Sequence, residues 1–122
     1  MIASGSEPRP PSFEGADLCM NSDDFFTMEE LPESMVVLGG GYIGVELAQI
    51  LQALGVQVTL IVRSRPLRFL DQDMLDILLD EMRHSGLNVL TDTPHEKVEK
   101  LENGRYRVVL ANGESVEAQR VM

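Results

Sequence analysis

The sequence has little cysteine, no long hydrophobic run and few basic residues. Its single cysteine, Cys19, cannot form an internal disulfide, and no cysteine pair is present to hold a structural zinc ion or to act as a redox dithiol. No apolar run approaches the roughly 18 residues that a membrane helix needs, and residues 1–16 lack the basic start and apolar centre of a signal peptide. We therefore expect a soluble intracellular protein without a membrane partner, cytoplasmic, with an organelle left open.

Basic side chains are outnumbered two to one. Ten lysines and arginines stand against twenty aspartates and glutamates, which gives a net charge of −10. Such a charge repels phosphate backbones and anionic lipids, so we expect no nucleic-acid partner. The one basic island is residues 63–70, which hold three arginines and no acid.

The chain divides into two parts by composition. Residues 1–34, here called the connector, are rich in proline, serine and acids, and Pro8, Pro10 and Pro11 favour an extended path. Residues 35–122 have the mixture of apolar and charged residues that one globular core requires. We therefore predict an extended connector followed by a single domain.

One short helix is expected inside the connector. Ser22 or Asp23 is placed to cap a helix near 24–31, and Pro32 would end it. The remainder of the connector gives no periodic signal, so we assign it no regular structure.

From residue 35 the pattern alternates between apolar strands and amphipathic helices. The first strand is apolar throughout, as is typical of a strand buried on both faces of a parallel sheet. Apolar residues at helical spacing follow it, and Gly55 is placed to cap that helix. The predicted order is a strand at 35–38, a helix at 43–54, a strand at 56–62, a helix at 71–84 and a strand at 87–91.

The last third of the sequence has a different pattern. The pairs Asn103-Gly104 and Asn112-Gly113 are strong signals of tight hairpins. They predict a three-stranded antiparallel meander with strands at 97–102, 105–110 and 115–119, followed by a short strand at 121–122. The expected fold class is α/β, a Rossmann-like parallel sheet with flanking helices plus this meander.

A G-x-G-x-x-G pattern lies between the first strand and the first long helix. Gly39 would permit the tight turn, Gly41 would let the backbone approach a pyrophosphate, and Gly44 would let the helix pack closely on the strand. The N–H groups at the helix start would then point at the phosphates. This arrangement predicts a dinucleotide site; the alternative is a glycine-rich turn without a ligand.

The residue that ends the second strand of such a fold meets the adenosine ribose. An acid there would bind the 2′-hydroxyl, but this position, nineteen residues after Gly44, is Arg63. Arg68 follows it, with Arg65 between them. The basic island therefore favours a 2′-phosphate and NADP(H), and the alternative is a set of solvated arginines in a loop.

These residues resemble the flavin-dependent pyridine nucleotide-disulfide oxidoreductases, glutathione reductase-like members above all, over essentially the whole chain. The most specific match is GGGYIGVE at residues 39–46. Residues 2–5 with Pro8 look like the segment, usually Ala-Thr-Gly, where these enzymes leave the FAD domain. Residues 22–26 and 29–32 resemble their lead into the nucleotide domain.

The resemblance implies a role for several side chains. The residue matching Tyr42 covers the nicotinamide pocket against the flavin, and the one matching Glu46 pairs with a lysine of the flavin domain. Arg63 and Arg68 match the 2′-phosphate ligands. Without the resemblance, Tyr42 would be a half-buried aromatic residue and Glu46 a solvated one. The predicted cofactor-binding residues are Gly39, Gly41, Tyr42, Ile43, Gly44, Glu46, Arg63, Ser64 and Arg68.

Two features depart from the glutathione reductase pattern. Those enzymes commonly have alanine at the position of Gly44, and glycine there is more usual in relatives that use NAD. The five-residue spacing from Arg63 to Arg68, with Ser64 after Arg63, looks more like animal thioredoxin reductase. The reduced disulfide therefore stays open between glutathione, thioredoxin and trypanothione.

The resemblance implies an NADPH-binding domain that presents the nicotinamide for hydride transfer to FAD. The redox cysteine pair, the FAD glycine motif and the dimerisation domain of the family have no counterpart in these residues, so FAD would belong to the full-length enzyme, a homodimer whose other domains are the partners. The chain alone is expected to be inactive, with no catalytic residue and no metal site, and His84 and His95 are taken as a helix-end and a loop residue. The alternatives are a free-standing nicotinamide sensor and a methyltransferase, although the latter would want an acid at Arg63.

Overall fold

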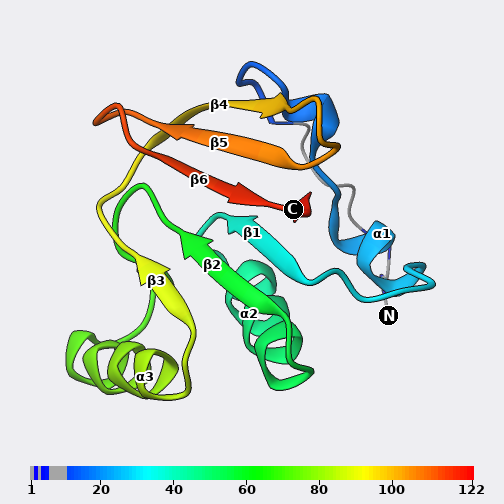
Figure 1. Ribbon diagram of the computed structural model, residues 1–122. Coiled ribbons are helices and arrows are strands. Elements are labelled where there is room, and N and C mark those ends of the chain that lie inside the picture. The colour runs from blue at the N-terminus through cyan, green and yellow to red at the C-terminus, as the bar shows by residue number, and fades with distance from the viewer. Residues whose placement is uncertain (1, 3, 6–10) are drawn as a thin grey trace.

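The computed structural model describes residues 2, 4–5 and 11–122. Two expectations fall on residues outside this range. The extended path at Pro8 and Pro10 lies wholly outside it, and the segment at 2–5 with Pro8 lies partly outside it. The elements are the 3-10 turn η1 (Ala16–Leu18), α1 (Ser22–Phe26), β1 (Ser34–Leu38), α2 (Tyr42–Ala53), β2 (Gln57–Ile61), α3 (Gln72–His84), β3 (Asn88–Leu90), β4 (His95–Lys100), β5 (Tyr106–Leu110), β6 (Ser115–Ala118) and β7 (Arg120–Val121). The order predicted from residue 35 onward is confirmed (Figure 1).

The first sheet is parallel throughout and has the strand order β3-β2-β1-β7. Helices α2 and α3 both pack on one of its faces. There Met35 and Val37 of β1 share a core with Leu51 of α2 and Leu75 of α3. Residues 35–38 of β1 are all apolar because this strand has neighbours on both sides and is covered on both faces.

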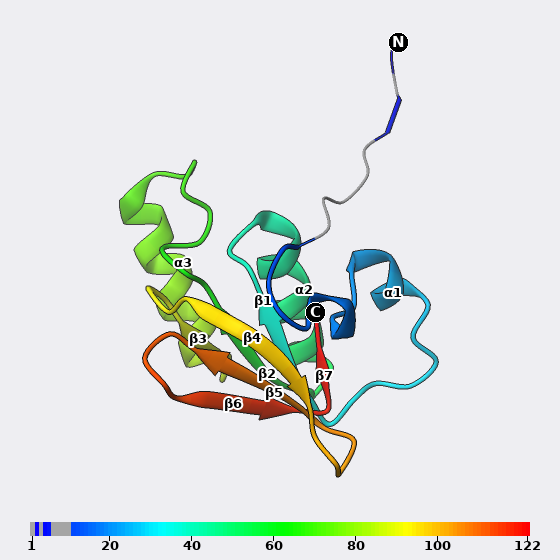
Figure 2. The same ribbon diagram turned by 90° about the horizontal axis from the view of Figure 1, so that it is seen from above.

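The second sheet is the antiparallel meander β4-β5-β6, and it covers the opposite face of the first. Val36 and Ile61 point to that side and pack against Val98, Val108 and Leu110. Figure 2 shows the resulting three layers, with helices, parallel sheet and antiparallel sheet in succession. The predicted α/β fold class with an added meander is confirmed, with both long helices on the same face.

The first meander strand lies two residues earlier than predicted. We expected 97–102, whereas β4 is His95–Lys100. The turn to β5 begins sooner because Leu101 donates its N–H to the carbonyl of Arg105 at 2.8 Å, and the Asn103 side chain accepts from the Arg105 N–H at 3.0 Å. These bonds use residues 101–105 for the turn rather than for the strands.

The connector helix is shorter than predicted and has a different cap. It covers residues 22–26 rather than 24–31. The cap is Asn21, whose side chain accepts from the N–H groups of two residues in the first turn, while the Asp24 carboxylate accepts from the Asn21 N–H at 2.8 Å. The Thr27 hydroxyl donates to the Asp24 carbonyl at 3.1 Å, which helps to end the helix after one turn.

From Phe13 onward the connector is packed onto the domain instead of running free. Val98 of β4 donates its N–H to the carbonyl of Glu14 at 2.9 Å, and Met20 donates to the carbonyl of Val121 at 2.8 Å. Phe13 packs against the core between the two sheets. The connector therefore forms one wall of the domain.

Candidate functional site

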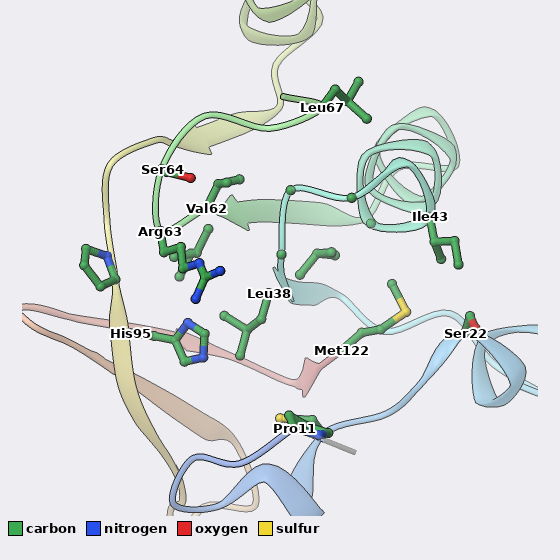
Figure 3. Close-up of a pocket in the computed structure, with 18 of the residues that line it drawn as sticks. Pro11, Ser22, Leu38, Ile43, Val62, Arg63, Ser64, Leu67, His95 and Met122 are labelled. Atoms are coloured by element: carbon green, nitrogen blue, oxygen red, sulfur yellow. The ribbon is translucent and has the colours of Figure 1, made fainter. Parts of the chain in front are cut away.

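A cleft of about 1300 Å³ opens at the carboxyl ends of β1 and β2. Its walls are residues 39–41 (the glycine turn), most of residues 62–70 (the arginine loop), residues 94–95, and parts of the connector. Figure 3 shows Arg63 and His95 at one end of this cleft and Ile43 and Met122 at the other. The carboxyl ends of parallel strands are where α/β sheets bind ligands.

The geometry at Gly39 and Gly44 agrees with the structural role predicted for each, and the phosphate-binding role of Gly41 stays a prediction. Gly39 has φ +124°, a conformation that other residues rarely adopt. A Cβ on Gly44 would lie 2.8 Å from the Gly39 carbonyl oxygen, so the start of α2 packs tightly on the turn. A Cβ on Gly41 would meet nothing within 4 Å. The Gly41 backbone is thus open to the cleft, as the close approach of a phosphate would require.

Gly40 is a site residue that sequence reasoning missed. A Cβ there would lie 2.5 Å from Cγ1 of Val62 and 2.7 Å from Cα of Pro66. The Leu67 N–H also donates to the Gly40 carbonyl at 2.7 Å. The glycine turn and the arginine loop are therefore in direct contact. The G-x-G-x-x-G pattern leaves this position unspecified, and the only available signal was the unbroken run of three glycines.

All three arginines of the arginine loop line the cleft, together with Ser64. Arg65 forms an ion pair with Asp76 of α3. Arg63 and Arg68 are exposed, and neither takes part in an ion pair among residues 11–122. The structure thus brings together Gly39, Gly41, Ile43, Gly44, Arg63, Ser64 and Arg68 around one cavity.

Two of the predicted residues lie outside the cleft wall. Tyr42 is 59% exposed at the start of α2, and Glu46 is exposed one turn later on the same helix. Their predicted roles concern a flavin and a lysine of another domain, so they stay predictions.

His95 and Cys19 also line the cleft, which no sequence pattern predicted, and His95 is the first residue of β4 rather than the expected loop residue. The His95 imidazole meets the Phe13 ring edge to face, with 4.6 Å between ring centroids, and burial lowers the pKa of His95. Burial, and secondarily the charge of Asp17, raises the pKa of the Cys19 thiol to about 11. Both residues reach the cleft because the connector docks beside β4. No local sequence pattern predicts this docking, because the two segments are far apart in the chain.

Within the described residues, no group of three or more histidine, cysteine, aspartate or glutamate side chains is arranged to hold a metal ion. The helices in this part of the chain are also too short or too polar to cross a membrane.

Comparison with known proteins identifies the family. The sequence profile described as pyridine nucleotide-disulphide oxidoreductase matches residues 1–122. The chain belongs to the pyridine nucleotide-disulphide oxidoreductases. These enzymes are flavin-dependent and use NAD(P)H, so the methyltransferase alternative is wrong.

Curated relatives lie within the disulfide reductases. Glutathione reductase of Yarrowia lipolytica is 40% identical over 109 residues, which cover 88% of this chain and 23% of the relative. Glutathione reductase of Schizosaccharomyces pombe is 38% identical, with 93% and 25% covered. Thioredoxin reductase 2 (mitochondrial) of Drosophila melanogaster is also 38% identical, with 92% and 22% covered. The chain therefore spans about a quarter of the length of these relatives.

Two solved structures show the same fold. The HOCl-induced flavoprotein disulfide reductase RclA from Escherichia coli matches with a TM-score of 0.87 at 24% identity, over 97% of this chain and 28% of that one. The water-forming NADH oxidase of Lactobacillus brevis, solved bound to NADH, matches with a TM-score of 0.82 at 26% identity, over 97% and 28%.

Proposed function

We propose that this chain is the NADPH-binding domain of a flavin-dependent, glutathione reductase-like disulfide reductase. The observation that carries the proposal is the joint position of the open Gly41 backbone and of Arg63 and Arg68 in one cleft. A dinucleotide phosphate needs both features, since the pyrophosphate requires bare backbone and the 2′-phosphate requires positive charge.

The residues around the glycine turn fit a pyrophosphate. Gly41 is the N-cap of α2, and no side chain caps its free N–H groups. Those N–H groups and the helix dipole favour an anion at this point. A bound pyrophosphate would therefore replace the missing cap.

The arginine loop fits the 2′-phosphate. Arg63 and Arg68 are exposed on the same cleft wall, with the Ser64 hydroxyl between them in sequence. The Ser64 carbonyl accepts from the Asp92 N–H at 3.0 Å, which fixes the loop beside the segment leading to β4. The two guanidiniums would hold the phosphate, and Ser64 would add a neutral donor.

The chemistry of the reaction belongs to the cofactor. When bound, NADPH supplies a hydride that FAD, held by other domains of the parent enzyme, accepts. The role of this chain is to bind and orient the dinucleotide. Tyr42 and Glu46 lie at the exposed start of α2, next to Ile43 at the cleft wall, which is where a flavin domain would contact them.

The disulfide that we propose as the substrate of the parent enzyme is oxidised glutathione. The support is the identity of 40% to a glutathione reductase, while the 38% identity to a thioredoxin reductase keeps thioredoxin as the second candidate. The other proposed partners are the FAD and dimerisation domains of a homodimeric parent.

The second candidate function is NADH binding. A neighbour in structure is an NADH oxidase solved with NADH, and Gly44 is the residue expected in relatives that use NAD. The two candidates differ in the 2′-phosphate alone, so the arginine loop decides between them. A free-standing nicotinamide sensor would bind through the same residues but would need no flavin partner.

Calorimetric titration of the 122-residue chain with NADPH and with NADH tests the proposal. We expect NADPH to bind about ten- to a hundredfold more tightly, because a charge-assisted hydrogen bond contributes about 1.5–3 kcal/mol. Raising the ionic strength from about 0.05 to 0.5 M should narrow this preference, since both guanidiniums are exposed and are screened by salt.

Variants locate the preference in the loop. The double change Arg63→Ala with Arg68→Ala should bring the two affinities close together and leave NADH binding unchanged. Arg83→Ala, which removes an exposed arginine at the end of α3, is the matched control and should change neither affinity. A preference for NADPH that survives in the double variant would refute the role of the two arginines.

A further inference from the structure

One ion pair beside the cleft has no part in the proposed function. Arg65 of the arginine loop donates from Nη2 to Oδ1 of Asp76, near the start of α3. Arg65 lines the same cleft as Arg63 and Arg68, which form no ion pair among residues 11–122. One of the three arginines that line this cleft is therefore held by an acid on a neighbouring helix.

The path of the arginine loop does not depend on this pair. The backbone is tied on both sides of Arg65: the Ser64 carbonyl accepts from Asp92 at 3.0 Å, and the Leu67 N–H donates to Gly40 at 2.7 Å. Pro66 is buried against the glycine turn. Loss of the Asp76 carboxylate should therefore free the side chain of Arg65 without moving its backbone.

The carboxylate of Asp76 opposes an anion in the cleft in two ways. It neutralises Arg65, and its negative charge, paired with a residue of the cleft wall, repels an approaching phosphate. The pair itself is weak, because the side chains of Arg65 and Asp76 are 40% and 62% exposed. A phosphate could thus compete with Asp76 for Arg65, but the competition lowers the contribution of the Arg65–phosphate contact to the binding affinity.

We propose that Asp76 is a specificity-determining residue, which limits the affinity for the 2′-phosphate by holding Arg65 against α3. The inference rests on the proposed function, because it concerns the same phosphate. It differs from that proposal in naming an acid, outside the glycine turn and the arginine loop, that sets the strength of the site.

The test is calorimetric titration of Asp76→Asn with NADPH and NADH. We expect NADPH to bind to Asp76→Asn about fivefold more tightly than to the unmodified chain. This factor is near the upper limit of the free energy that an exposed charge pair contributes. NADH affinity should stay within about twofold, because NADH lacks the 2′-phosphate. The double variant Asp76→Asn with Arg65→Ala should lose the gain, since the gain comes from Arg65.

Asp80→Asn is the matched control. Asp80 lies one turn further along α3 and has its own arginine partner, Arg83, at 3.6 Å. The control removes the same charge from the same helix without freeing an arginine of the loop. Thermal unfolding of both variants should show midpoints close to that of the unmodified chain.

Several results would overturn the inference. Equal gains in the Asp76 and Asp80 variants would show a general charge effect, and a loss of NADPH affinity in Asp76→Asn would show that the acid aims Arg65 at the phosphate. No change in Asp76→Asn, with the NADPH preference of the unmodified chain intact, would refute this inference alone. Equal affinities for the two dinucleotides in the unmodified chain would refute the proposed specificity and this inference together.

Discussion

The thiol of Cys19 lines the cleft, yet its surroundings make it a poor nucleophile. Burial and the nearby charge of Asp17 raise its pKa to about 11. A thiol reacts as the thiolate, and two pKa units lower the thiolate fraction on the order of a hundredfold at mildly alkaline pH. We therefore expect alkylation of the folded chain by iodoacetamide to be slower than that of free cysteine by about this factor.

The same assay contains its own controls. Asp17→Asn should speed the reaction modestly, because the acid is the smaller of the two causes of the raised pKa. Unfolding the chain in urea should restore the rate of free cysteine, because burial is the larger cause. Alkylation of the folded chain at the rate of free cysteine would show that the thiol is not buried as the structure has it.

Single residues of the site were predictable where their role is local. The local geometry at Gly39 and Gly44 was predictable, since a positive φ and a close contact within one turn follow from the motif itself. Gly40 and Asp76 were not predicted, because each acts on a residue of the arginine loop that is distant in sequence. Spacing along the chain does not reveal such partners.

At the scale of elements, two neighbouring glycines of the glycine turn have different expected roles. Gly40 is expected to matter for the packing of the arginine loop, and Gly41 for the binding of the dinucleotide. Gly40→Ala would place a Cβ within 2.7 Å of the Pro66 backbone, so the arginine loop would have to shift. We expect a loss of about 1–3 kcal/mol in the free energy of unfolding, the usual cost of overpacking, together with weaker NADPH binding. Urea denaturation and calorimetry measure the two effects.

Gly41→Ala is the matched variant in the same turn. Its φ is −74° and its Cβ would meet nothing within 4 Å, so the fold should keep its stability within about 0.5 kcal/mol. Binding of either dinucleotide should fall about tenfold or more, because the Cβ would occupy the space that a pyrophosphate needs. Normal binding by Gly41→Ala would place the phosphate elsewhere in the cleft.

Element types from residue 35 onward were predictable, whereas the bounds of β4 and of the connector helix α1 were not. The strands and helices follow from apolar periodicity, which persists over whole segments. The ends of α1 and β4 depend instead on individual hydrogen bonds, such as those of Thr27 and Leu101. A shift of one such bond moves a boundary by a residue or more without changing the composition of the segment.

At the scale of the whole molecule, the layers are joined by contacts that span most of the chain. The buried Ser34 hydroxyl accepts from Nη2 of Arg105 at 3.0 Å and from the Gln119 N–H at 3.1 Å, which ties β1 to the meander. The sequence predicted both sheets but not their stacking, nor the docking of the connector on β4. These arrangements depend on the complementarity of surfaces, which periodicity does not encode.

The composition of the whole chain bears on whether it can oxidise NADPH by itself. Electrons from NADPH reach a disulfide in this family through FAD. The sequence has one cysteine and one G-x-G-x-x-G segment, and that segment already lines the cleft proposed for NADPH. We therefore expect the purified 122-residue chain to bind NADPH without oxidising it, so that the nicotinamide absorbance with oxidised glutathione should fall no faster than in the blank.

Two additions make this last expectation decisive. Free FAD added to the assay should not start turnover, because the described residues offer it no second glycine turn, while a full-length glutathione reductase added to the same cuvette should start it at once and show that the assay works. The titration of the chain with NADPH shows separately that the cleft is competent. Two results would contradict this expectation: turnover that elutes together with the chain through successive chromatography steps, or a flavin absorbance band in stoichiometric amount. Either would mean that the chain holds a hydride acceptor of its own, so that FAD would not be held by the other domains of the enzyme alone.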